Sequence, residues 1–497
     1  MATSTAFTNS RVARGVAIKT IFKDLRAGNV AFLPQRIAIF GQGSTLSTYS
    51  TVKAQITSAY EAGTTYGFGS PIHLAALQMF PINGDGVGSI PVTVYPLDDD
   101  GTGVVSDGDI TPSGTITAAA QYTVEVNNIV SEPFVISVAD TVAAIVTAMT
   151  TAINAVLDMP IIAVDGTTKV TFTSKWKGVS ANDIYVEVVG STTVGNVFTI
   201  TQANGGLVNP DVDAALAQMG DIWETLVLNC MELSDTATLG KFSVVGEGRW
   251  GAEVRRPFAV LTGETEATVA TATAGAEARK TDRVNGQVSV PGSNDLPLQV
   301  AARAIARIAL RADNDPAYDF GSMPLTGITP GTDAEQWTST QRDYAIKRGA
   351  SSVKVKDGVV NLADTVTFYH PTGEVVPAYR YVVDIIKIMT ILYNLDLIFD
   401  SVEWDGKPLV PDNQVITNPN AKKPRMAVGD IWLLIESLAQ NAIISDAAFA
   451  KDNTFASIDT QNPKRLNINS TMKISGNSNV ISVDFNFGFY FGTATII

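Results

Sequence analysis

The 497-residue sequence predicts a mixed α/β and α+β protein of several domains. Three observations support this class: an apolar strand and glycine turn at residues 36–41, an acidic block at residues 98–209, and strict apolar alternation near the C-terminus. The length allows two to four domains, and a hydrophobic content of 45% is ordinary for globular proteins. We therefore expect a discontinuous α/β core, an inserted α+β domain and strand arms at both ends.

The α/β core is expected in two pieces, residues 31–97 and 210–328. A buried strand at residues 36–41 precedes a glycine turn and a helix expected over residues 50–62, an order typical of open α/β units. The same alternation resumes after the acidic block. Further strand or helix segments are expected at 92–95, 214–219, 225–228 and 298–310.

The block between the two core pieces is bounded by loop-forming compositions at both ends. Residues 97–208 hold twelve Asp or Glu against three Lys, which predicts a solvent-facing module. Apolar residues at helical spacing from Val142 to Leu157 predict one helix, with Asp140 or Thr141 placed to cap it. About 110 residues suffice for an independently folded domain. Its strands are expected at 122–126, 134–138, 170–173 and 184–188.

The last third, residues 329–497, is expected to form a C-terminal domain that ends in a donated strand from about residue 480. Helices are predicted over residues 379–393 and 429–441. The most apolar run of the chain, 385–399, is interrupted by Lys387, Asn394 and Asp396, so we do not expect it to span a membrane. Strands are expected at 353–355, 365–369 and 466–474, followed by the terminal strand.

The terminal segments carry strand patterns that lack an obvious partner. Side chains alternate faces along a strand, so residues 481–491 predict one long strand of roughly 36 Å with an apolar, aromatic face. Such a strand needs a sheet, either of its own domain or of a neighbouring copy. Residues 1–30 are expected to be a basic arm, for which we favour strand pairing over nucleic-acid binding. The arm positions are Val16, Ile18, Thr20, Ile481, Val483, Phe485, Phe487, Phe489 and Phe491.

Charge and cysteine content exclude several functions. A formal net charge of −14 argues against wholesale binding to nucleic acid or anionic lipid. The single cysteine, Cys230, excludes an intramolecular disulfide and a thiolate metal cluster, and indicates synthesis in a reducing cytoplasm. The N-terminal residues lack the apolar core of a signal peptide, so secretion by that route is not expected.

We find no catalytic, cofactor or metal motif. Gly41-Gln42-Gly43-Ser44 follows a strand, but Leu46 stands where a dinucleotide loop needs its third glycine, and the Lys of a phosphate loop is absent. His73 and His370 are far apart in the sequence, which favours ordinary polar packing over a metal site. We therefore expect neither enzymatic activity nor a cofactor.

The order of these features resembles the contractile phage tail sheath proteins, in particular their Mu-like branch, over nearly the whole chain. The resemblance rests on residues 36–42, on Lys177-Gly178 and Asn182-Asp183-Ile184 in the insertion, and on later segments. These later segments are Asp295-Leu296-Pro297, Asp315-Pro316-Ala317, Leu325-Thr326-Gly327-Ile328 and residues 349–360. Residues 362–371 depart from the family pattern.

The resemblance implies a structural role in a phage tail. Family members have an inner α/β region with insertions facing outward, and they form stacked six-subunit rings around a tail tube. Their terminal arms join sheets of adjacent subunits, so the expected partners are other copies, the tail tube protein, and baseplate and tail terminator proteins. We expect assembly in the host cytoplasm, residence in the virion tail, no direct contact with nucleic acid and no membrane insertion. Basic residues expected to face the tube are Lys422, Lys423, Arg425, Lys451, Lys464 and Arg465.

Other functions stay open at the sequence level. A sheath of a headless contractile injection system, or tailocin, would have the same sequence features. An α/β enzyme with an accessory domain is kept open by the turn at Gly41, although a nucleophile and base are not in evidence. A secreted adhesin fits the acidic insertion but not the missing signal peptide.

Overall fold

The computed structural model describes residues 30–191, 195–373, 378–485 and 487. They divide into two compact units. The large unit comprises Phe32–Leu392 and the described residues from Gly476 onward, and the small unit comprises Val30, Ala31 and Tyr393–Ser475. The chain is thus a mixed α/β, multidomain protein. Within the described residues, no helix has the length and apolar character that crossing a membrane requires.

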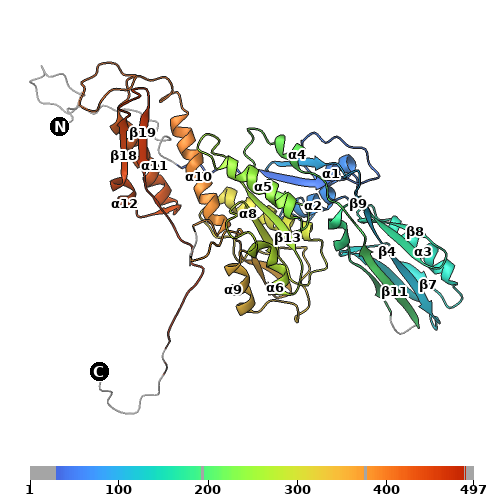
Figure 1. Cartoon of the computed structure of the whole chain (residues 1–497). Helices are drawn as coiled ribbons and strands as arrows, with labels where there is room; N and C mark the ends of the chain where they lie inside the picture. The colour runs from blue at the N-terminus through green and yellow to red at the C-terminus, as the bar shows by residue number, and fades with distance from the viewer. Residues whose placement is uncertain (1–29, 192–194, 374–377, 486, 488–497) are drawn as a thin grey trace, which may run out of the picture. The chain divides into compact units, whose positions relative to one another are not determined.

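The large unit is built on a six-stranded sheet with the order β14-β13-β12-β1-β3-β2 (Figure 1). All neighbouring pairs are parallel except β2 with β3. Residues of β1, β3, β12 and β14 are all buried, as expected for a parallel sheet covered on both faces. The strands are β1 Ile37–Gln42, β2 Ala54–Ile56, β3 Val92–Leu97, β12 Leu226–Asn229, β13 Ala259–Glu264 and β14 Asn285–Ser289.

Helix α8, Pro297–Asn314, packs along β12, β13 and β14 and also against α2. Pro297 occupies its first turn, where a missing N–H costs nothing, and alanines on its buried face allow close approach to the sheet. The other helices of this part are α1 Ala59–Tyr66, α2 Pro71–Met79, α4 Asp213–Ala217, α5 Thr236–Arg249, α6 Val269–Ala272 and α7 Ala274–Glu277.

The insertion leaves the sheet after β3 and returns before α4. It contains two four-stranded sheets, one with β10, β5, β6 and β7 and one with the order β11-β4-β9-β8. Helix α3, Val142–Asn154, packs against strands of both sheets, and the Oγ1 of Thr141 caps it by accepting from the Ala144 N–H. The remaining elements are β4 Val105–Gly114, β5 Ala120–Val126, β6 Ile129–Val130, β7 Phe134–Ile136, β8 Ile161–Asp165, β9 Val170–Lys177, the 3₁₀ helix η2 Val179–Asp183, β10 Val186–Gly190 and β11 Asn196–Asn204.

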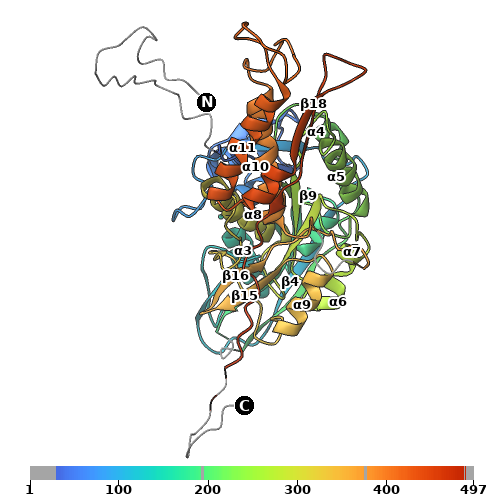
Figure 2. The ribbon, with the colours of Figure 1, turned by 90° about the vertical axis from the view of Figure 1, so that its left-hand side faces the viewer.

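The large unit is completed by a helix, a hairpin and the first half of a long helix (Figure 2). Ser351 and Thr367 form isolated bridges to the edge strand β14, which protects that edge from further pairing. The chain passes into the small unit between Leu392 and Tyr393, within α10. These elements are α9 Ser339–Lys347, β15 Ser352–Lys356, β16 Val359–Asp364 and α10 Val382–Phe399.

In the small unit, helix α11 buries Ile431, Leu434, Ile435 and Leu438 on one face, and strand β18 packs against the helix. Strands β18 and β19 form an antiparallel hairpin, and β17 pairs with β20. The elements are α11 Pro424–Gln440, β17 Ile444–Ser445, α12 Ala447–Asp452, β18 Thr454–Ile458, β19 Leu466–Ser470 and β20 Lys473–Ile474.

Several element predictions require correction. The helix expected at 50–62 is wrong, because residues 54–56 pair with β3 as β2 and the helix begins only after Ser58, whose hydroxyl accepts from the Glu61 N–H. Residues 365–369 form bridges rather than a strand. The strand expected at 466–474 is two strands, β19 and β20. The helices predicted near 142–157, 379–393 and 429–441 are confirmed with shifted ends.

Candidate interface residues and the junction cleft

The turn after β1 lies at the carboxyl ends of the parallel strands, where open α/β sheets usually bind ligands. Here the chain's own side chains fill that place. A Cβ at Gly43 would overlap the ring of Tyr49, and Tyr49 donates its hydroxyl to the Leu97 carbonyl at 2.9 Å. Gln42 donates to the Lys177 carbonyl at 2.8 Å and also bonds to Asp99. Gly43 is therefore explained by packing in this turn.

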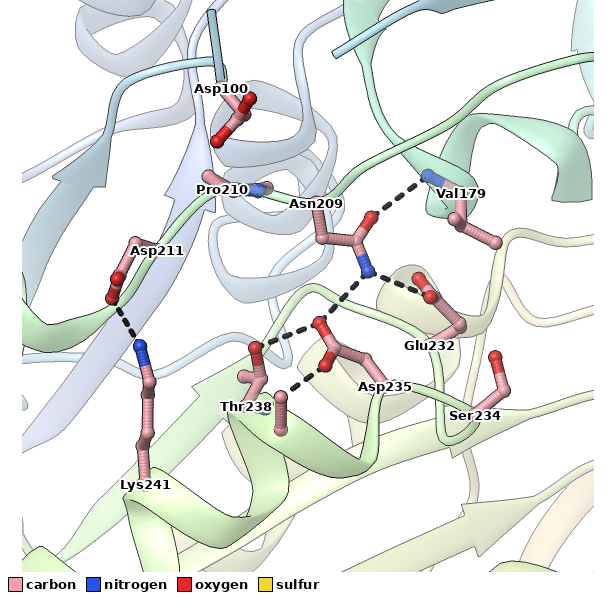
Figure 3. A pocket seen from close by; sticks show the side chains of 11 residues that line it. Asp100, Val179, Asn209, Pro210, Asp211, Glu232, Ser234, Asp235, Thr238 and Lys241 are labelled. Atoms are coloured by element: carbon pink, nitrogen blue, oxygen red, sulfur yellow. Dashed lines mark hydrogen bonds and ion pairs between the residues drawn. The ribbon is translucent and has the colours of Figure 1, made fainter. Parts of the chain in front are cut away.

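A cleft of about 460 Å³ opens where the insertion rejoins the sheet (Figure 3). Asn209 lies at its centre and joins three segments. Its Oδ1 accepts from the Val179 N–H at 2.8 Å, and its Nδ2 donates to Glu232 at 2.7 Å and to Asp235 at 2.9 Å. Asp235 also caps α5 by accepting from the Thr238 N–H. These internal bonds make the cleft a joint between the insertion and the sheet.

The electrostatics of this cleft are acidic but partly compensated. Lys241 lies 2.6 Å from Asp211 and 2.9 Å from Asp213, and its hydrogen bond lowers the pKa of the Asp211 carboxyl. Burial raises the pKa of the Glu232 carboxyl. Across the described ranges, no group of three His, Cys, Asp or Glu residues is arranged to hold a metal ion.

The two histidines lie in separate environments, each beside a carboxylate. His73 is buried in α2, where its Nδ1 accepts from the Gly69 N–H at 3.0 Å and burial lowers its pKa. His370 lies 3.1 Å from Glu277 through Nε2. Cys230 is buried at the end of β12, and burial raises the pKa of its thiol. These contacts agree with polar and apolar packing at all three positions.

Of the predicted arm residues, Val16, Ile18, Thr20, Phe489 and Phe491 lie outside the described residues. The four that are described lie in extended chain that belongs to no strand, so the predicted terminal strand is not formed within this single chain over residues 481–485 and 487. The rings of Phe485 and Phe487 are 4.4 Å apart. The exposed fractions are 78% for Ile481, 73% for Val483, 70% for Phe485 and 88% for Phe487.

The six predicted tube-facing residues all lie in the small unit but differ in exposure. Lys423 is buried, and its ammonium donates to the carbonyls of Asp412 and Gln414, so it is not available as a surface cation. Lys422 pairs with Glu403 at 3.1 Å, and Lys451 pairs with Glu436. The residues that are exposed are Arg425, Lys464 and Arg465, the last two beside each other in the turn between β18 and β19.

The sequence interpretation missed the places where the arms begin. Asn477, just before the exposed C-terminal segment, bonds to Lys387 of α10. Ala31, just after the N-terminal segment, bonds to Asn394 of the same helix. The available signal was the interruption of the apolar run 385–399 by these two polar residues. In the sequence alone, this interruption argues only against a membrane span.

Comparison with known proteins supports the resemblance. No protein-family model matches the chain. The Mu-like prophage FluMu tail sheath protein of Haemophilus influenzae is 23% identical over 449 residues, covering 86% of this chain and 88% of that protein.

Solved structures similar to the chain include the sheath tail protein of Listeria innocua, with 12% identity, coverage of 90% and 94%, and a TM-score of 0.48. The sheath of the extracellular contractile injection system PVC in its contracted state has 9% identity, coverage of 96% and 98%, and a TM-score of 0.47. The resemblance rests on the sequence match. The chain resembles the Mu-like tail sheath proteins over most of its length, as its sequence predicts.

Proposed function

We propose that this chain is the structural subunit of a contractile tail sheath, which polymerises into stacked six-membered rings around a tail tube. Its contraction would drive the tube through a host envelope for genome delivery. The observation that carries the proposal is the match to a tail sheath protein along 86% of the chain. That relative is named as a prophage protein, which favours a phage tail over a headless injection system. Because the relative is named for a structural role, the enzyme alternative is disfavoured.

The finer architecture belongs to the same proposal. The sheet built from residues 31–97 and 210–328, together with the C-terminal residues 329–497, would form the inner sheath. The acidic insertion, residues 98–209, would face outward, where its negative charge is solvated. Within the virion tail, the subunit would contact other copies, the tail tube protein, and baseplate and tail terminator proteins.

The arms would link neighbouring copies by strand donation. The C-terminal segment exposes alternate apolar side chains, which is costly unless a partner covers them. A two-stranded sheet is marginal alone, and the β18–β19 hairpin of the small unit carries no charged residue that would block pairing at its edges. Donation to this hairpin would bury the apolar face and satisfy backbone groups on both chains.

Tube formation by the intact chain, seen in electron microscopy, tests the proposed function, and arm deletion tests the arm model within it. Removing residues 1–20 or 481–497 takes away the linking strand, so each truncated protein is expected to be a soluble monomer in sedimentation and to give no tubes in electron microscopy. The matched control replaces the alternate residues Ser482 and Asp484 with alanine, which keeps the apolar positions and should keep the tubes. Normal sheaths from either truncation would overturn the arm model.

A further inference from the structure

Helix α10 contains a buried lysine, Lys387. Lys387 is fully buried, as are Ile385, Ile386 and Met389 of the same helix. A buried ammonium is costly unless it is paired and hydrogen-bonded, and an apolar side chain of similar length would pack there without that cost. The contacts of Lys387 therefore indicate what it does.

These contacts lead to the start of the C-terminal arm. The Nζ of Lys387 lies 3.3 Å from Asp384 and donates to the Oδ1 of Asn477 at 2.6 Å. Asn477 in turn donates through Nδ2 to the Ala317 carbonyl at 2.9 Å. Asn477 is thus held on two sides, and only four residues later the chain reaches Ile481, the first of the alternating apolar positions of the arm.

A second buried polar residue of α10, Asn394, makes an equivalent contact within the small unit. Its Nδ2 donates to the Ala31 carbonyl at 2.8 Å and its Oδ1 accepts from the Ala31 N–H at 3.0 Å. The side-chain amide thus bonds to both backbone groups of Ala31, as the backbone of a paired strand does. The adjacent Val30 N–H donates to the Oγ of Ser437 in α11 at 2.7 Å. Asn394 and Ser437 are both buried. The chain that leads from the N-terminal arm is therefore fixed by three hydrogen bonds.

We propose that α10 is the anchoring element of both arms, with Lys387 positioning the root of the C-terminal arm through Asn477 and Asn394 positioning the root of the N-terminal arm through Ala31. The inference rests on the proposed function, in which the arms link copies. A fixed root leaves about four residues, or at most roughly 14 Å of chain, between Asn477 and Ile481. So short a tether keeps the donated strand at high effective concentration near one acceptor, and it transmits tension to a helix.

Spin labelling of the unassembled full-length chain tests the C-terminal anchor. Cys230 is buried, so a nitroxide attached through Val480→Cys, at an exposed position, reports on the root alone. Lys387→Met removes one charge-assisted hydrogen bond to Asn477. We expect the mobile fraction of the label to rise about tenfold as a result. Asn477→Ala breaks the same hydrogen bond from the side of the arm and should raise the mobile fraction equally. It keeps the test decisive if Lys387→Met perturbs folding. Ser478→Ala is the matched control and should leave the spectrum unchanged.

The N-terminal anchor is tested with the label at Val30→Cys, where Asn394→Leu should mobilise it and Met426→Leu, on the exposed face of α11, should not. Unchanged spectra in both Lys387→Met and Asn477→Ala, or in Asn394→Leu, would overturn the inference without touching the proposed function. Sheath assembly is then scored by microscopy. Loss of tubes in the anchor variants supports the inference, and normal tubes from them overturn it. Normal tubes from the arm truncations instead overturn the arm model, whereas failure of the intact chain to form tubes overturns the proposed function.

Discussion

At the scale of single residues, buried polar groups mark the places where separate segments are joined. Partly buried Lys175 of β9 has the same role, since its ammonium donates to the carbonyls of Phe68 and Leu157, each at 3.0 Å, between the core and the insertion. Burial lowers the pKa of Lys175 to about 8, although the nearby carboxylate of Asp158 opposes the shift. His73 faces the same Asp158 from α2.

This environment predicts a pH dependence. Below pH 8 Lys175 is protonated in both the folded and the unfolded chain, and its burial costs stability. Between pH 8 and its usual range above 10, the unfolded chain binds more protons, so the free energy of unfolding contributed by this group rises with pH. We expect the difference in unfolding free energy, wild type minus Lys175→Met, to increase from pH 8 to pH 10 in urea titrations. Exposed Lys354→Met should give a difference that is flat across this range, and a flat result for Lys175 would contradict the prediction.

At the scale of elements, Asn209 ties the insertion to the sheet through three side-chain hydrogen bonds. Asn209→Ala removes the donors to two carboxylates and the acceptor for the Val179 N–H. Because these groups are partly buried and lose their hydrogen-bond partners, we expect the free energy of unfolding to fall by about 1–3 kcal/mol. We expect a lower melting temperature in calorimetry. Asn204→Ala, in the exposed end of β11, is the control, and equal melting temperatures for the two variants would show that Asn209 does not hold the joint.

The sequence predicts elements well where burial alone decides them. The apolar positions of α3 follow helical spacing because one face packs on two sheets, and its cap at Thr141 is readable. Strand β4 was missed because Val105–Gly114 contains Asp, Gly, Pro and Ser, which favour turns. It is a strand because β9 and β11 pair with it on both sides, a tertiary effect that overrides local preference.

The candidate site was predictable to a similar degree. Alternation identified the apolar face from Ile481, because a period of two is visible in the sequence itself. The anchors were not predictable. Lys387 and Asn477 are 90 residues apart in the sequence, and Asn394 and Ala31 are 363 residues apart. No local sequence pattern reveals such pairs. The charge of Lys423 predicts a surface position, whereas its side chain is buried and its ammonium donates to the carbonyls of Asp412 and Gln414.

At the scale of the whole molecule, charge opposes the proposed association between copies and favours the proposed association with the tail tube. Each copy carries a formal net charge of −14, so packing copies into rings brings like charges together. The proposed contact with the tube relies instead on exposed basic residues, Arg425, Lys464 and Arg465, together with the paired Lys422 and Lys451. Screening by salt weakens repulsion and attraction alike, with a Debye length of about 10 Å at 0.1 M and about 3 Å at 1 M.

We therefore expect salt to shift the two equilibria in opposite directions. Raising NaCl from 20 mM to 500 mM, a range in which the Debye length falls several-fold, should increase the fraction of sheath protein that sediments as polymer. The fraction of preformed tube that co-sediments with it should fall. Reversing the charges of Arg425, Lys464 and Arg465 to Glu should mimic high salt for tube binding, while Lys354→Glu with Lys356→Glu, in the large unit, should not. If the reversed variant retains tube as the wild type does at low salt, these residues do not face the tube, because exposed ion pairs that form the contact would be lost at once when their sign changes.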